Sequence, residues 1–376
     1  MSLELLKIYN ARNLKEYTVS PHPLYNIFYG VNGAGKTTVL ESVFLLLRSK
    51  TFRSVKYKSF INRDSNNCTV FAKFSHSDGI TLENSFTLGI SRSKDLSQPV
   101  IHLNSEKVTS LSAITKLVIL GLITPQSFNL IDAGPSIRRK FIDWGVFHVE
   151  PGFLSDWKAY NKILDNRNTL LKKLSVRYGR TSSEYLPDHQ LDNLNCWSPQ
   201  LIELNNKLHK VRLRQVNNIA ILFTQYLKIF SVDLSNEIKL SYYQGWNKDL
   251  TYEDYLQLKL KDDVMAGYTR YGTHRGDINI NIKNYPAKDL LSRGQKKIVI
   301  ICLILAQFTF LVQRVKNTDH SLLLLDDIDS ELDQTNLEIL FTILNTIKSQ
   351  VLVTSTNKDR FDFLKRKNYQ LFHVEH

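Results

Sequence analysis

Cysteine is scarce in this sequence, and the few cysteines present are scattered. Cys68, Cys196 and Cys302 are the only three in 376 residues. Their positions lack the close spacing of thiol ligands around a metal ion. The composition therefore argues against a cysteine-ligated metal centre, and we expect the protein to work in the reducing cytoplasm.

Long apolar runs are equally rare. The strongest one, residues 298–312, contains Gln307 and is shorter than the ~20 residues that a membrane helix needs. It directly follows Lys296 and Lys297, so it predicts a buried helix and no membrane partner. Residues 1–4 lead straight into a strand-like pattern, without the features of a signal peptide. There is no internal repeat and no low-complexity tail, which favours a globular chain of two lobes.

Acidic residues are outnumbered, with 36 of them against 49 basic ones and a net charge of +13. A charge of this sign favours binding to polyanions such as nucleic acids. No motif for reading bases is visible, so we expect contacts to phosphates with little sequence preference. For any single basic residue, a solvated surface position is the alternative interpretation. The basic residues gather in two groups: Arg48, Lys50, Arg53, Lys56, Lys58 and Arg63, and then Lys158, Lys162, Arg167, Lys172, Lys173, Arg177, Arg180, Lys207, Lys210, Arg212 and Arg214.

A glycine-rich segment follows the first buried-strand pattern. Residues 24–29 are apolar and favour a strand, and residues 38–47 continue as an apolar helix. Between them, glycines allow backbone amides to approach phosphates, a lysine reaches the β- and γ-phosphates, and a threonine hydroxyl binds Mg²⁺. The predicted nucleotide-binding residues are Gly30, Val31, Asn32, Gly33, Ala34, Gly35, Lys36, Thr37 and Thr38. A glycine-rich turn that contains lysine by chance is the alternative.

Two adjacent carboxylates end a second buried-strand pattern. Residues 321–325 are almost entirely leucine, as in a central parallel strand. Carboxylates at the end of such a strand must face water or a cation, because burying an unpaired charge is costly. We predict that Asp326 binds Mg²⁺ and that Asp327 polarises the attacking water. The alternative is that two acids end this strand by chance.

A third segment, residues 289–295, precedes the apolar run and resembles the signature of ATP-binding-cassette (ABC) proteins. Ser292 and Gly294 would open a helix whose N-terminus faces an anion, with Gln295 beside them. In ABC proteins this segment closes over the ATP of a partner chain. The resemblance therefore implies that ATP binds between two chains, with Ser292 taking part in catalysis. The long separation of loop and signature resembles the heads of SMC-like ATPases rather than transport cassettes.

The intervening region predicts a helical arm. A heptad-like apolar stripe is interrupted by Arg167, and a second stripe follows a helix start in which Ser198 caps and Pro199 takes the first position. Residues 175–197 are rich in Ser and Asn and predict the connecting loop. The first stripe consists of Phe153, Trp157, Tyr160, Leu164, Leu171 and Leu174. The two helices predict an antiparallel hairpin.

These patterns predict an α/β fold: an ABC-type ATPase head with a P-loop and a mixed sheet, joined to a helical lobe with a short arm. Residues 1–120 hold the phosphate loop and an antiparallel β layer, with strands at 69–74, 80–90 and 100–103. Residues 121–240 form the helical lobe and arm. Residues 241–376 return to the ATPase lobe with the signature and the acid pair.

Several further segments make the chain resemble the RecF family of bacterial DNA replication and repair proteins. They are residues 10–13, 50–53, 124–125, 134–143, 166–171, 272–277 and 330–333. The resemblance implies an ATP-dependent homodimer that clamps duplex DNA and single-strand/duplex junctions, with RecO and RecR as partners in loading RecA. It also implies slow hydrolysis, since Thr354, Ser355 and Thr356 stand where many ABC proteins have a switch histidine. Ala11, Thr273 and Gly276 depart from the family pattern.

Two single residues are further candidates for this site. Gln126 lies where the glutamine of an ABC Q-loop contacts Mg²⁺ and water. Arg12 is a candidate for the nucleotide phosphates, with a surface salt bridge as the alternative. Two other functions stay open: a nucleotide-binding switch in which turnover matters little, and the ATPase head of an SMC-like or phage-defence complex. The sequence contains no fused nuclease motif that would favour the latter.

Overall fold

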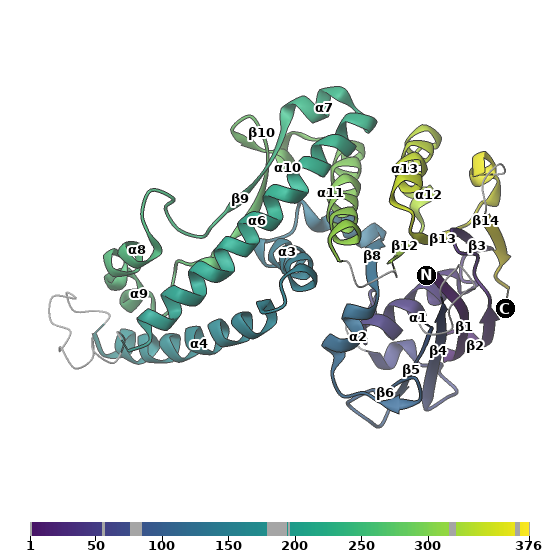
Figure 1. Cartoon of the computed structure of the whole chain (residues 1–376), viewed down its shortest axis with the longest axis horizontal. Coiled ribbons are helices and arrows are strands. Elements are labelled where there is room, and N and C mark those ends of the chain that lie inside the picture. Colours follow the sequence, from purple (N-terminus) through teal and green to yellow (C-terminus); the bar gives the residue numbers. More distant parts are fainter. Residues whose placement is uncertain are drawn as a thin grey trace. The chain divides into compact units, whose positions relative to one another are not determined.

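The computed structural model describes residues 2–54, 57–75, 85–178, 194, 196–315, 321–364 and 369–375 (Figure 1). The chain forms two compact units. The first consists of Met1–Asn129 and Arg293–His376, and the second of Leu130–Ser292. The ATPase unit is thus discontinuous along the sequence.

The boundaries of the units differ from the predicted ranges. Residues 241–292 were predicted to return to the ATPase lobe, but they belong to the second unit. The reason is a hydrogen-bonded ladder: β9 (Ile238–Tyr243) pairs along its whole length with β10 (Asp277–Ile282). Helix α9 (Leu260–Ala266), between these strands, packs on the arm helix α4 (Phe153–Tyr178). The ATPase unit resumes at the signature.

A five-stranded parallel sheet carries the first unit, in the order β14-β3-β13-β12-β8. Its strands are β3 (Tyr25–Tyr29), β8 (Ile119–Ile123), β12 (Ser321–Leu325), β13 (Gln350–Ser355) and β14 (Tyr369–His373). The two strands predicted beside the loop and the acid pair are confirmed. Because all neighbouring pairs are parallel, the segments that follow these strands lie at one edge of the sheet.

A separate antiparallel sheet forms the predicted β layer, in the order β2-β1-β4-β5-β6-β7. The strands are β1 (Ser2–Ala11), β2 (Leu14–Val19), β4 (Asn67–Ser75), β5 (Phe86–Ser93), β6 (Val100–Leu103) and β7 (Glu106–Lys107). Part of the strand predicted at 80–90 lies outside the described residues. One buried apolar cluster includes side chains of this sheet, of the parallel sheet and of α1 (Lys36–Arg48), so α1 packs between two layers.

Helix α11 (Arg293–Arg314) contains the long apolar run. Among the described residues it is the one helix with the length and composition of a membrane span, and 67% of its most apolar window is buried inside the protein. It packs against β8, whereas α12 (Ile328–Glu331) and α13 (Gln334–Ile347) follow β12. The prediction of a buried helix is confirmed.

The second unit is built on two long helices, α4 and α6 (Ser198–Phe230), which lie side by side (Figure 1). Short elements complete the unit: α3 (Pro135–Val149), α7 (Val232–Glu237), α8 (Tyr252–Leu258), β11 (Tyr285–Pro286) and α10 (Ala287–Leu290). The predicted apolar stripe of α4 is buried except for Trp157, which is 38% exposed. The predicted loop at 175–197 is wrong at its start, since α4 continues to Tyr178; residues 179–193 and 195 lie outside the described residues.

The predicted cap of α6 is also wrong. Ser198 is already helical, the N-cap position belongs to Trp197, and no side chain caps the helix. The Ser198 hydroxyl instead donates to the carbonyl oxygen of Leu194 at 3.3 Å. Pro199 therefore takes the second helical position instead of the predicted first one, still within the first turn, where a missing N–H costs nothing.

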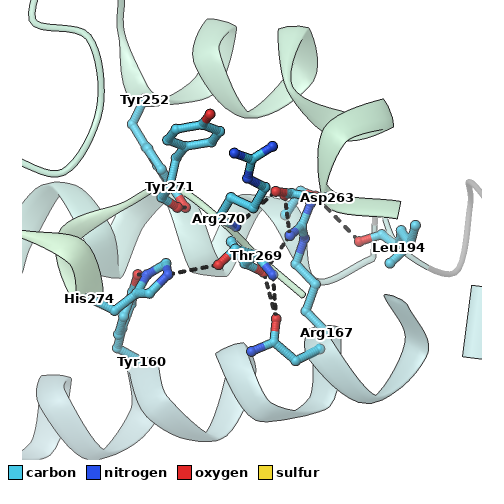
Figure 2. A network of polar contacts seen from close by, with 11 residues as sticks. Tyr160, Arg167, Leu194, Tyr252, Asp263, Thr269, Arg270, Tyr271 and His274 are labelled. Atoms are coloured by element: carbon cyan, nitrogen blue, oxygen red, sulfur yellow. Dashed lines mark hydrogen bonds and ion pairs between the residues drawn. The ribbon is translucent and has the colours of Figure 1, made fainter. Parts of the chain in front are cut away.

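Arg167 does not interrupt the arm but anchors it (Figure 2). Its Nη1 donates to Oδ2 of Asp263 at 2.8 Å and to the hydroxyl of Thr269. Asn168 accepts from the amide and the hydroxyl of Thr269, both at 2.8 Å. Tyr160 and His274 are hydrogen-bonded at 2.8 Å, which extends the network. The segment after α9 is therefore tied to α4 by buried polar contacts.

Candidate nucleotide-binding site

The glycine-rich segment between β3 and α1 has the conformation of a phosphate-binding loop. Gly30 and Gly35 have φ angles of 155° and 108°, in the region that disfavours side chains. A Cβ at Gly30 would lie 2.5 Å from the carbonyl oxygen of Val374, and one at Gly35 would lie 2.8 Å from Leu14. Both positions therefore require glycine, and α1 begins directly behind them with its N-terminus at the loop.

Lys36 is folded back onto this loop. Its Nζ donates to the carbonyl oxygens of Gly30 at 2.8 Å and of Val31 at 2.9 Å. These bonds stabilise a buried ammonium group and keep it at the place where phosphate oxygens would take over as partners. The side chain of Val31 itself is largely exposed, and that of Ala34 is buried in the core.

A cavity of about 390 Å³ opens at the loop. Its volume falls within the range typical of small-ligand sites. It brings together most of the predicted phosphate-binding residues, Asp327 and two arginines. The lining residues are Arg12, Asn13, Asn32, Gly33, Gly35, Lys36, Thr37, Thr38, Arg53 and Asp327.

Asp326 is buried behind the cavity, and its environment fits an Mg²⁺ ligand. Its Oδ1 accepts from the hydroxyl of Thr354 at 2.8 Å. Burial raises the pKa of Asp326, and hydrogen bonds from Thr354 and Thr37 oppose that shift. Of the three predicted metal ligands, Thr37 and Asp326 therefore lie near each other, whereas Gln126 lies in the separate segment that follows β8. No cluster of three or more His, Cys, Asp or Glu side chains suited to a metal occurs in the described part of the chain. Few protein ligands are expected when phosphates share the ion.

Asp327 begins the turn after β12 in a left-handed conformation, with φ of 50°. Its amide donates to the Thr354 hydroxyl oxygen at 2.9 Å. Thr354, the first of the three residues that stand in place of a switch histidine, therefore connects the backbone of Asp327 to the carboxylate of Asp326. These two bonds hold the Asp326 carboxylate and the Asp327 backbone in place relative to β13.

Arg12 forms an ion pair, but with a buried carboxylate rather than at the surface as the alternative interpretation expected. Its Nη2 pairs with Oε2 of Glu41 at 2.6 Å, and the same side chain lines the cavity. Glu41 lies on α1 and is fully buried, which raises its pKa, while Arg12 opposes that shift. Glu41 also accepts from the amide of Arg53 at 3.3 Å. One buried carboxylate thus holds two arginine-bearing segments at the cavity.

Sequence reasoning did not assign Asn13 or Arg53 to the site. Asn13 donates to the carbonyl oxygen of Gly33 at 2.8 Å and accepts from the Thr38 hydroxyl at 3.3 Å, so the β1–β2 turn is attached to the loop. Both residues belong to segments that carried the family resemblance, 10–13 and 50–53, which was the available signal.

Other predicted residues lie elsewhere. Gln126 is exposed on the 3-10 helix η3 (Pro125–Leu130), which follows β8 beside β12. Gly294 and Gln295 lie in the first turn of α11 and are not among the residues that line the cavity. Ser292 is the last residue of the second unit and is exposed.

The predicted basic surface of the arm needs one correction. Arg167 and Arg212 are buried and paired with carboxylates, so they are unavailable for phosphates. Arg212 makes a bidentate contact to Asp143, at 2.7 and 2.9 Å. The arm residues that remain exposed are Lys158, Lys162, Lys172, Lys173, Lys207, Lys210 and Arg214. Lys56 and Arg180 lie outside the described residues, and the side chain of Arg177 is not described either.

Two departures from the family pattern are accommodated by local contacts. Thr273 is fully buried, and its hydroxyl accepts from Arg212 at 2.8 Å. At Gly276 a Cβ would lie 2.5 Å from the hydroxyl of Tyr242, so the missing side chain makes room for that tyrosine.

The parallel sheet, the phosphate loop and the acid pair define an ATPase head of the ABC fold class. Comparison with known proteins narrows this class. The family model for the RecF/RecN/SMC N terminal domain matches residues 2–376. The DNA replication and repair protein RecF of Pseudomonas putida (strain W619) is 35% identical, over 100% of this chain and 97% of that protein. The chain therefore belongs to the RecF family.

Solved structures agree with this assignment. The structure of the recombination mediator protein RecF-ATPrS in the RecFOR pathway has a TM-score of 0.76 and 26% identity, covering 96% of this chain and 93% of that one. The Smc head bound to the C-winged helix domain of ScpA has a TM-score of 0.54 at 15% identity, covering 96% and 91%. The latter likeness concerns the fold alone.

Proposed function

We propose that this protein is an ATP-dependent DNA-binding protein of replication and recombinational repair, in which two chains enclose ATP. The observation that carries the proposal is one cavity containing the phosphate loop and Asp327, with Asp326 buried behind it. The names of the relatives, a DNA replication and repair protein and a recombination mediator in complex with ATP, support the same activity. The signature residues Gly294 and Gln295 lie away from the cavity lining, which supports their action on the ATP of a second chain.

In this proposal each residue has one role. Lys36 and the amides of the loop bind the phosphates, and Arg12 adds positive charge. Thr37 and Asp326, with Gln126 as a further candidate, would hold Mg²⁺, which neutralises phosphate charge when bound. Asp327 orients the attacking water. Thr354, Ser355 and Thr356 stand where many ABC proteins have a switch histidine, and their hydroxyls cannot accept and release a proton near neutral pH, which supports slow turnover.

The proposed polymer partner is DNA. The net charge of +13 and the exposed lysines of the arm favour contacts to its phosphates, at duplex regions and at single-strand/duplex junctions. By family membership we propose RecR and RecO as protein partners in loading RecA, and a cytoplasmic, nucleoid-associated location. Hydrolysis, stimulated by DNA, would then release the clamp.

The test is to measure the molecular mass of the protein in solution with and without ATP and DNA. We expect dimers only with ATP, and we expect Ser292→Arg to abolish them, because an arginine side chain would occupy the place of the partner's γ-phosphate. Ser97→Arg adds the same side chain at an exposed residue of another loop and is the control. A chain that remains monomeric with ATP and DNA would refute the proposal.

A nucleotide-binding switch is the second candidate function, and the lack of a switch histidine at residues 354–356 favours it. The Asp327→Asn variant distinguishes the hydrolysis-driven clamp from the nucleotide-binding switch. If the variant assembles on DNA and supports RecA loading while turnover disappears, then binding is the essential act. If assembly survives but release and repeated loading fail, hydrolysis is needed to reset the clamp.

A further inference from the structure

Lys297 joins three segments of the first unit. It lies on α11, two residues beyond Gln295, and its Nζ is 2.6 Å from Oε2 of Glu331. The same group donates to the carbonyl oxygen of Glu331 at 3.2 Å. It also lies 5.9 Å from the ring centroid of Phe128, on the helix η3 that carries Gln126. One ammonium group therefore connects the signature helix, the segment after the acid pair and the segment after β8.

The N-terminal part of α11 is an unfavourable place for the positive charge of Lys297. The beginning of a helix carries partial positive charge, and α11 has no acidic residue in its first turn. Glu331 supplies the missing negative charge from another segment. The Lys297 and Glu331 side chains are only 29% and 20% exposed, so solvent screens their attraction less than that of a surface pair.

The segment that carries Glu331 is held from its other side as well. Ser355 donates to Oδ2 of Asp329 at 2.6 Å. Arg360 donates to the carbonyl oxygens of Asp329 and Leu332. The short helix α12, which follows Asp327 directly, is therefore attached to β13 and η6 (Lys358–Leu364) on one side and to α11 on the other. A displacement of α12 is therefore expected to displace the N-terminal part of α11 through the Lys297–Glu331 pair.

We propose that the Lys297–Glu331 pair is a positioning device that couples the two ATP sites of the dimer. This inference rests on the proposed two-chain site. Within one chain, Asp327 acts on the ATP bound by that chain, whereas Ser292, Gly294 and Gln295 face the ATP of the partner. The pair joins these two groups, so occupation of one site sets the signature segment that completes the other.

The test uses Lys297→Glu, Glu331→Lys and the double exchange. In the nucleotide-free protein, we expect hydrogen exchange of residues 328–333 to become faster by about fivefold in each single variant. With ATP, we expect the protein concentration for half-maximal dimer formation to rise by about fivefold or more. Binding of a fluorescent ATP analogue to the monomer should change by less than about twofold, since Lys297 does not line the cavity. The double exchange restores both exchange and assembly.

The matched control is Lys73→Glu, which breaks the exposed pair of Lys73 and Glu4 in the same unit and should change neither readout. Unchanged exchange and assembly in both single variants, or a folded double variant without recovery, would overturn the inference. If ATP-dependent dimers form normally in the variants, the coupling fails while the proposed function stands. A failure of the unaltered chain to dimerise removes both.

Discussion

Arg167 and Asp263 form an ion pair enclosed by the second unit, with 2.8 Å between Nη1 and Oδ2 and 1% exposure of each side chain (Figure 2). The other carboxylate oxygen of Asp263 accepts from the amide of Arg270 at 2.9 Å. The pair therefore joins α4 to α9, and the bond to Arg270 adds the segment that leads from α9 to β10.

The first prediction concerns this pair. Arg167→Met leaves the Asp263 carboxylate buried without its cation, so we expect a loss of about 3–5 kcal/mol in the free energy of unfolding. Adding Asp263→Asn removes the charge but keeps an acceptor for the Arg270 amide, and should recover part of that loss. Denaturant unfolding measures both. Arg214→Met, in the partly exposed pair with Glu150, is the control and should cost less than about 1 kcal/mol. An equal cost at the two arginines would contradict the role of burial.

His274 should make stability depend on pH. Burial lowers its pKa to about 4, with nearby Arg275 adding to the shift and a bond to the Thr269 carbonyl opposing it. Between that value and about 6.5, the unfolded chain binds a proton that the folded chain does not, so stability falls as the pH falls. From pH 7 to pH 5, we expect the unaltered chain to lose about 2 kcal/mol more than His274→Gln.

The measurement is denaturant unfolding at both pH values. Several buried carboxylates, such as Asp263, have raised pKa values and act in the opposite direction, so only the difference between variant and unaltered chain isolates His274. His102→Gln, at an exposed histidine of β6, should keep the behaviour of the unaltered chain. Identical pH slopes for His274→Gln and the unaltered chain would refute the assignment.

Glu41 should affect nucleotide binding without lining the cavity. Glu41→Gln removes the charge that holds Arg12 and weakens the contact to the Arg53 amide. Hydrogen bonds to charged groups are worth ~1.5–3 kcal/mol, so we expect the affinity for a fluorescent ATP analogue to fall by about tenfold. Glu16→Gln, at an exposed glutamate of β2, is the control. Full affinity in a folded Glu41→Gln protein would show that Arg12 needs no such support.

Thr354 should affect turnover more than binding. Thr354→Val removes the hydroxyl that bonds both Asp326 and the Asp327 amide. Loss of such an outer contact typically costs ~10–100-fold, so we expect at least about a tenfold lower rate of ATP hydrolysis. Thr354→Ser keeps the hydroxyl and should retain most of the rate. Equal rates for the valine and serine variants would mean that the contact does not orient the acids.

Local chemistry explains which predictions succeeded. The strand predicted at 321–325 coincides with β12, since a short apolar run of this length is typical of a buried strand in a parallel sheet. The loop after β3 was predictable because its glycines and lysine lie within one short segment, residues 30–36. The cap at Ser198 failed because the helix begins one residue earlier than the Ser–Pro pattern suggests, at a place where Ser198 bonds back to Leu194.

The sequence by itself determined the phosphate loop, the acid pair and the strands beneath them, because each of these depends on neighbouring residues and on the periodicity of apolar side chains. Only the tertiary structure decided that Arg167 and Arg212 are buried and paired, because in the sequence they resemble the exposed basic residues around them. Whether a charge can be buried depends on its partner, and the partner of Arg167 is 96 residues away along the chain. The same holds for the unit boundary, where pairing of β9 with β10 retained residues 241–292.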